Sequence, residues 1–112
     1  MNLKILNEHI KFEHFKMSNI YSVLNMISKG CFMAKIDLKD AYYSVRIAKR
    51  YQKYLKFEFD NQLYQFTCFP NGLGPCPRKF TKIMKVPTSN LRKAGIPVCG
   101  YIDDLFTKSQ SY

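Results

Sequence analysis

Two adjacent carboxylates inside an apolar run constrain this chain more than any other feature. The run from Val98 to Phe106 reads VCGYIDDLF and contains Asp103 and Asp104. Its apolar residues predict two short buried strands, joined by a tight turn that holds both acids. Ionised Asp is rarely buried without a partner or a metal. Two interpretations stay open: a solvent-exposed turn, where Asp is common, and a site for a divalent cation such as Mg²⁺, which binds carboxylate oxygens.

A second apolar run also ends on an acid. Residues Cys31 to Asp37 alternate in the manner of a buried strand, and Asp37 closes it. Asp37 and Asp103 are 66 positions apart (103 − 37), so only folding can bring them together. If their strands are neighbours in a sheet, they are separated by about 5 Å, which two metal ions can bridge.

Local signals predict a helix and a hairpin in the first two thirds of the chain. Ser18 is the expected N-cap of a helix with apolar residues at helical spacing, which ends near Gly30. Residues 53–68 alternate on both sides of the turn dipeptide Asp60-Asn61, a pattern typical of a β-hairpin.

The remaining segments complete the predicted order of helix, strand, hairpin, helix and hairpin. Residues 1–16 hold no clean period and are expected to be partly extended. Residues 69–77 are rich in Gly and Pro and form a loop before a helix, which Pro87 is expected to break or kink. This order indicates an α+β fold with a mostly antiparallel sheet packed on helices.

Composition limits the chain to one domain and favours a polyanionic partner. Among its 112 residues, 18 Lys and Arg face 8 Asp and Glu, a net charge of +10. Such a balance favours nucleic acid, although a merely basic protein is the alternative. The four cysteines fit no zinc module and are expected to be reduced thiols. No signal peptide or transmembrane stretch is present in the sequence, so an intracellular protein of cytoplasm or nucleus, without membrane contact, is expected.

Three motifs, in order, resemble the palm of a reverse transcriptase, an RNA-directed DNA polymerase. Residues 37–45 (DLKDAYYSV) resemble the first catalytic motif of that family. Residues 69–77 (FPNGLGPCP) resemble the second, a Leu-Pro-x-Gly loop that opens a helix. Residues 101–104 (YIDD) match the third, the Tyr-x-Asp-Asp box. The resemblance covers nearly the whole chain and is closest to retrotransposons of the long-terminal-repeat and tyrosine-recombinase types.

The resemblance implies a two-metal nucleotidyltransferase that joins a dNTP to a primer 3′-hydroxyl. It assigns two Mg²⁺ ions, for which Mn²⁺ can substitute, to the catalytic residues Asp37, Asp103 and Asp104. It implies a nucleotide-binding set made of Leu38, Asp40, Ala41, Tyr42, Asn71 and Gly72. It implies that Tyr101 lies by the primer end and that Arg78 meets the template.

Some of these positions carry their own alternatives. Tyr42 stands where the family has an aromatic under the sugar of the incoming nucleotide, where it would exclude a ribose 2′-hydroxyl, but a core tyrosine is the competing interpretation. In the second motif Phe69 replaces a usual Leu. Pro75 removes a backbone donor, and Cys76 stands where a hydroxyl is expected.

The resemblance also implies a partial domain. Residues 1–112 are expected to be palm with part of the fingers, without the upstream fingers hairpin, the primer grip and the thumb. RNase H and integrase or recombinase regions of a longer polyprotein are expected elsewhere, and the isolated fragment is expected to be inactive. The partners implied are an RNA or DNA template with its primer, and dNTP. The alternatives are a non-catalytic basic nucleic-acid-binding module, another palm polymerase such as an RNA-directed RNA polymerase, and a decayed retroelement remnant.

Overall fold

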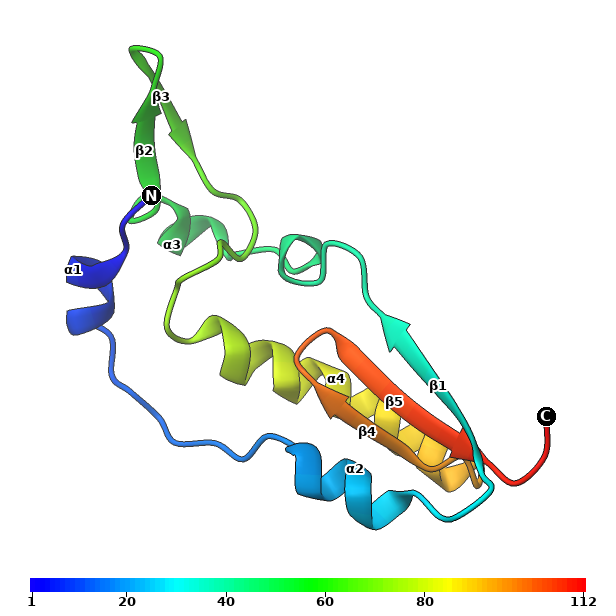
Figure 1. The fold of residues 1–112 in the computed structure, drawn as a ribbon. Helices are drawn as coiled ribbons and strands as arrows, with labels where there is room; N and C mark the ends of the chain where they lie inside the picture. The colour runs from blue at the N-terminus through cyan, green and yellow to red at the C-terminus, as the bar shows by residue number, and fades with distance from the viewer. The chain divides into compact units, whose positions relative to one another are not determined.

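The chain folds as two compact units that are interleaved in sequence. The computed structural model describes all residues from 1 to 112. Unit 1 consists of Met1–His14 and Asp40–Pro77, and unit 2 consists of Phe15–Lys39 and Arg78–Tyr112. Each unit has its own antiparallel sheet (Figure 1). The prediction of mixed α and β structure with antiparallel pairing is confirmed.

The sheet of unit 2 contains both acidic runs. Its three strands are β1 (Phe32–Asp37), β4 (Val98–Tyr101) and β5 (Asp104–Ser109). They are antiparallel in the order β1-β5-β4 (Figure 1). The strand that ends on the first acid is therefore a direct neighbour of the strand that begins with the last one.

Helix α4 (Cys76–Lys93) supports this sheet from residue 78 onward. Val98 and Leu105 are 3% and 7% exposed, and Phe80 of α4 is 3% exposed. The guanidinium of Arg92 donates two hydrogen bonds to the Val98 carbonyl oxygen, at 2.8 and 3.1 Å. The last turn of the helix is thereby tied to the start of β4.

Helix α4 continues through Pro87. The prediction that Pro87 breaks the helix is therefore wrong. The buried Phe80 and Thr88 are eight positions apart and lie on one helical stripe. The Thr88 hydroxyl donates to the Met84 carbonyl oxygen at 2.8 Å. Pro87 itself is exposed, where water can satisfy the carbonyl that its missing N–H leaves free.

Helix α2 (Ile20–Met26) begins one residue later than the sequence suggests. Its N-cap is Asn19 and not Ser18, because the Asn19 side chain accepts from the Ser22 N–H and the Ser22 hydroxyl accepts from the Asn19 N–H. Such a reciprocal capping box satisfies two unpaired N–H groups. The Cys99 thiol of β4 lies 3.6 Å from the Ser22 carbonyl oxygen.

Strand β1 is not buried, contrary to the sequence prediction. All six of its residues are exposed, including Phe32 at 49% and Met33 at 58%. The strand is at the edge of its sheet and pairs only with β5. Its alternating pattern identified the strand correctly, but the packing of its faces depends on the neighbouring elements.

Unit 1 holds the remaining elements. Its helices are α1 (Lys4–Glu8), the 3₁₀ helix η1 (Tyr42–Ser44) and α3 (Lys49–Gln52). Strands β2 (Lys56–Phe59) and β3 (Gln62–Gln65) form its hairpin. The expectation of a partly extended entry over residues 1–16 is wrong for α1, which has no side-chain cap to announce it.

The core of unit 1 gathers residues that are far apart in sequence. Buried apolar side chains from the entry segment, the α3 region and the loop before α4 form it, namely Leu3, Ile47, Leu55, Leu73 and Cys76. Burial raises the pKa of the Cys76 thiol to about 12. All four cysteines are free thiols.

The hairpin turn confirms the prediction from Asp60-Asn61. Both residues adopt positive φ, 50° and 55°. Two successive left-handed residues are typical of the two-residue turn that matches strand twist, and Asn and Asp tolerate this region best after Gly. This explains how the hairpin forms without the usual glycine.

None of the helices combines the length and apolar composition needed to cross a bilayer.

Candidate active site

The strand register of unit 2 brings the three predicted acids together. Asp37 is paired directly with Asp104 in the β1–β5 ladder, and Asp104 is also paired with Tyr101 in the β4–β5 ladder. The Leu38 N–H donates to the Asp103 carbonyl oxygen at 2.9 Å. Directly opposed residues have Cα atoms about 4.5–5.5 Å apart and point to the same face. The Asp37 and Asp104 side chains thus lie on one face at the carboxyl end of β1, and Asp103 precedes Asp104 in the adjoining turn.

The turn between β4 and β5 is formed by Ile102 and Asp103. Asp104 is already the first residue of β5, so the prediction that both acids occupy the turn is wrong for Asp104. Ile102 has φ +54°, which is rare and strained for a β-branched residue. A Cβ added to Gly100 would lie 3.0 Å from Leu105 Cδ2, so a larger residue here would force the buried Leu105 side chain to shift by a few tenths of an ångström.

Lys35 is the cation of this acidic group. Its Nζ lies 3.0 Å from Asp104 Oδ1, and the two side chains are 62% and 42% exposed. Its pKa is raised by the hydrogen bond to Asp104 and by the charge of Asp104, with smaller contributions from Asp37 and Asp103 and a small opposing effect of burial. The sequence analysis missed Lys35. Its position two residues before Asp37 was the available signal, because such residues share a strand face.

The acids of unit 2 supply carboxylate oxygens, the type of ligand that a hard divalent cation prefers. No three His, Cys, Asp or Glu side chains are grouped closely enough to hold a metal ion. Mg²⁺ in phosphate-transferring sites is held by one or two carboxylates, and substrate phosphates and water complete its shell. Two opposed carboxylates on neighbouring strands with a third at the adjoining turn are suited to that kind of site.

The predicted primer and template residues also belong to unit 2. Tyr101 is 53% exposed and stands directly opposite Asp104. Arg78 lies in the first turn of α4 and is half-buried. Tyr101 is therefore the predicted residue that the structure joins to the acids.

The predicted nucleotide-binding residues other than Leu38 belong to unit 1. Asp40 adopts φ +53°, and its carbonyl oxygen accepts from the Ser44 N–H at 3.0 Å. Ala41 is 6% exposed, and its carbonyl oxygen accepts from the Ser44 hydroxyl at 2.6 Å. Tyr42 is half-buried and packs against the unit 1 core, the contact expected of a core tyrosine.

The glycine-rich loop of unit 1 is held by a residue that the sequence analysis missed. Asn7 Nδ2 donates to the Gly72 carbonyl oxygen at 2.9 Å, and Asn7 Oδ1 accepts from the Gly74 N–H at 2.8 Å. Gly72 adopts φ +88° with open space where a Cβ would be. Asn71 Nδ2 lies 3.4 Å from the Tyr43 hydroxyl. No local signal marks Asn7, because its partners are more than 60 positions away.

Sequence comparison decides the family. The whole chain, residues 1–112, matches the family described as reverse transcriptase (RNA-dependent DNA polymerase). The chain belongs to the reverse transcriptase family. This is the family that the three motifs at residues 37–45, 69–77 and 101–104 resemble.

The curated relatives of the chain are much longer polyproteins. The chain is 24% identical over 110 residues to Polyprotein P3 of Commelina yellow mottle virus, which covers 98% of this chain and 6% of that protein. It is 25% identical over 111 residues to the Transposon Tf2-3 polyprotein of Schizosaccharomyces pombe, which covers 99% of this chain and 8% of that protein. The chain thus spans less than a tenth of either relative.

A solved reverse transcriptase has the same fold. The foamy viral protease-reverse transcriptase, solved in complex with an RNA/DNA hybrid, matches 98% of this chain and 14% of its own. The TM-score is 0.81 at 19% sequence identity. The arrangement of antiparallel strands and helices described above is therefore that of a retroviral reverse transcriptase.

Proposed function

We propose that residues 1–112 are the palm, with part of the fingers, of a retroelement RNA-directed DNA polymerase. The observation that carries this proposal is the register of β1 and β5, which sets Asp37 opposite Asp104. The hydrogen bond from the Leu38 N–H to the Asp103 carbonyl oxygen brings in the third acid. The substrates proposed are a dNTP and a primer on an RNA or DNA template. Whether the element is of the long-terminal-repeat or tyrosine-recombinase type stays a prediction.

The residues proposed to hold two Mg²⁺ ions are Asp37 and Asp103, supported by Asp104. Bound ions supply positive charge that activates a primer hydroxyl and stabilises the leaving pyrophosphate. The chain's own part is to hold the carboxylates on two paired strands before substrate arrives. Lys35 offsets their mutual repulsion, since its ammonium is bound to Asp104 and attracted by the other two.

The nucleotide-binding proposal in unit 1 relies on backbone groups. The N–H groups of Asp40 and Ala41 donate to no other backbone group, so they are free to meet a triphosphate. Ser44 fixes this short segment through both of its own bonds to these residues. Tyr42 is proposed to present its ring to the sugar of the incoming nucleotide, and its packing against the unit 1 core would hold the residue in place.

A Mn²⁺ titration tests the metal proposal without requiring activity. Paramagnetic broadening of amide signals reports on residues near the bound ion. We expect selective broadening at residues 36–38 and 100–105, and its loss in Asp103→Asn. The matched control is Asp60→Asn, which removes one carboxylate at the hairpin turn of unit 1 and suits the positive φ of that position.

The outcome decides between two classes of function. Selective broadening that survives in Asp60→Asn and disappears in Asp103→Asn supports a catalytic palm, and primer extension with the longer polyprotein becomes the next assay. A dispersed spectrum with no selective broadening would contradict the metal site. In that case a non-catalytic nucleic-acid-binding module would explain the net charge of +10 better.

A further inference from the structure

A short segment of unit 1 gathers cations and tyrosines on the surface. The segment contains four basic residues and two tyrosines, all exposed: Lys49, Arg50, Tyr51, Lys53, Tyr54 and Lys56. We call these six residues the basic–tyrosine surface. No acidic residue occurs between Asp40 and Glu58. The surface therefore carries four positive groups, and the nearest acid in sequence is Glu58, which shares the face of β2 with Lys56.

Buried neighbours fix the backbone of this surface. Ile47 and Leu55 are 9% and 3% exposed and belong to the unit 1 core. Gln52 Nε2 donates to the Ile47 carbonyl oxygen at 2.8 Å, and the Leu55 N–H donates to the Gln52 carbonyl oxygen at 2.9 Å. Because these contacts anchor both ends of the segment, the residues between them are held outward by the fold.

Two of the four cations lie over aromatic rings, and none of the four is paired with a carboxylate. The Arg50 guanidinium lies 4.9 Å from the centroid of the Tyr51 ring, and Lys53 Nζ lies 5.0 Å from that of Tyr54. The two rings are 52% and 59% exposed. The structure's salt bridge joins Lys35 to an acid in unit 2, so no ion pair neutralises the four cations here.

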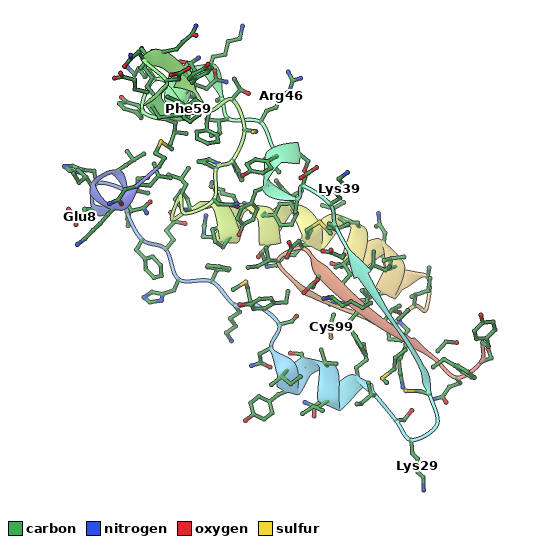
Figure 2. All side chains as sticks on the ribbon, turned by 45° about the horizontal axis from the view of Figure 1, so that its top comes forward. Glu8, Lys29, Lys39, Arg46, Phe59 and Cys99 are labelled. Atoms are coloured by element: carbon green, nitrogen blue, oxygen red, sulfur yellow. The ribbon has the colours of Figure 1, made fainter.

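Hairpin β2–β3 carries further exposed rings beside this surface. Phe59 is 69% exposed and Tyr64 is 44% exposed. Figure 2 shows Phe59 at the hairpin and the Arg46 side chain extending from the ribbon just before α3. Exposed rings next to cations that have no carboxylate partner suit a ligand that has both flat faces and negative charge, because bases stack on aromatic rings while phosphates contact Lys and Arg.

We propose that the basic–tyrosine surface binds a single-stranded polynucleotide. Its four cations contact successive phosphates, and the rings of Tyr51 and Tyr54 stack on bases. A single strand is favoured over a duplex because only unstacked bases offer their faces to an aromatic ring. This contact is separate from the acids of unit 2 and needs no metal. The inference rests on the proposed function only for the identification of the bound strand as the template.

Fluorescence anisotropy with a labelled oligouridylate of about 12 nucleotides, in EDTA and at several NaCl concentrations, tests the surface. The test variant is Arg50→Gln/Lys53→Gln/Lys56→Gln. For single strands each lost phosphate contact makes the slope of log K against log[salt] less steep by about 0.7. We therefore expect the slope to fall by about 2 for three lost contacts.

The matched control removes the same charge elsewhere. Lys4→Gln/Lys11→Gln/Lys29→Gln also lowers the net charge by three at exposed positions, and we expect its salt slope to stay near that of the unchanged chain. A separate variant, Tyr51→Leu/Tyr54→Leu, keeps every charge and should bind roughly thirtyfold or more weakly if each of the two rings stacks on a base. Circular dichroism of each variant verifies folding, and Arg50→Gln alone, with an expected slope change of about 0.7, replaces a triple variant that does not fold.

Two results would overturn the inference. Equal losses in the test and control triples would show attraction to net charge alone. Unchanged binding in the tyrosine variant, together with equally effective competition by polyglutamate, would show a general polyanion surface. Neither result bears on the Mn²⁺ titration, because this assay contains no free divalent ion. Failure here and failure of the metal site are therefore separate outcomes.

Discussion

The Asn7 side chain gives the sharpest structural prediction, because its two hydrogen bonds hold the glycine-rich loop of unit 1. Replacing it in Asn7→Ala removes the donor to the Gly72 carbonyl oxygen, 2.9 Å away, and the acceptor for the Gly74 N–H, 2.8 Å away. A net hydrogen bond contributes about 0.5–1.5 kcal/mol. Both bonds are solvent-accessible, so we expect the free energy of unfolding to fall by about 1–2 kcal/mol, in the lower part of the sum.

Urea denaturation followed by circular dichroism measures that loss, and amide hydrogen exchange at Gly74 localises it. The variant Asn7→Asp separates the two bonds, since it keeps an acceptor for the Gly74 N–H and loses the donor to Gly72. Gly74 should stay protected in Asn7→Asp and lose protection in Asn7→Ala. Asn25→Ala, at an exposed position of α2, is the control and should leave both readouts unchanged or slightly raise stability.

The reasoning would fail in either of two ways. If Gly74 exchanges equally fast in the unchanged chain and in Asn7→Ala, the side chain does not hold the loop. If Asn7→Ala unfolds at the same urea concentration as Asn25→Ala, the two bonds contribute nothing beyond what water supplies. Loss of protection throughout unit 1 would instead mean that Asn7 supports the whole core and not the loop alone.

Three further outcomes follow from the packing and the charges. Burial raises the pKa of the Cys76 thiol from 9.0 to about 12, so Cys76 should react with a thiol reagent only on unfolding, while the other three cysteines react in the folded chain. The stabilisation that comes from burying a protonated Cys76 thiol is full below pH 9 and is lost as the pH approaches 12. A pH series of urea midpoints would show this loss. Gly100→Ala should lower stability by about 1–3 kcal/mol through overpacking, because the new Cβ meets buried Leu105 at 3.0 Å, and a midpoint equal to that of the unchanged chain would contradict the hairpin geometry. Asp104 raises the pKa of Lys35, so the ion pair stabilises the fold below the ordinary pKa of 10.5, and this stabilisation is lost as the pH rises above it. NMR titration of the lysine should show a smaller rise in its pKa in Asp104→Asn. An unchanged titration would exclude the ion pair.

Local patterns were enough to find most elements, since they depend on neighbouring residues. Alternation identified β1 and the β2–β3 hairpin, and Asp60-Asn61 specified its turn because both residues tolerate positive φ. The exact first residue of a helix is harder to predict, because adjacent residues can both serve as the cap. Asn19 replaced Ser18 as the cap of α2 because Ser22 completes a reciprocal bond, a choice between adjacent residues that sequence preference alone does not make.

Burial and long-range packing required the tertiary structure. The same alternation that marks β1 fits a buried or an exposed strand, and the edge position left it exposed. Pro87 is a helix breaker by local preference, yet the stripe that includes Phe80 and Thr88 keeps α4 packed on both sides of it. In each case the neighbouring element outweighed the local preference.

The candidate site divides in the same way. The sequence by itself determined the family, since the whole chain matches it, and its motifs select Asp37, Asp103 and Asp104 as the proposed metal ligands. Only the tertiary structure decided that Asp37 faces Asp104, that Lys35 binds Asp104 and that Asn7 holds a loop 67 positions away. The physical reason is that strand register and side-chain pairing are set by which distant segments meet, and a one-residue slip would turn every side chain of a strand to the other face.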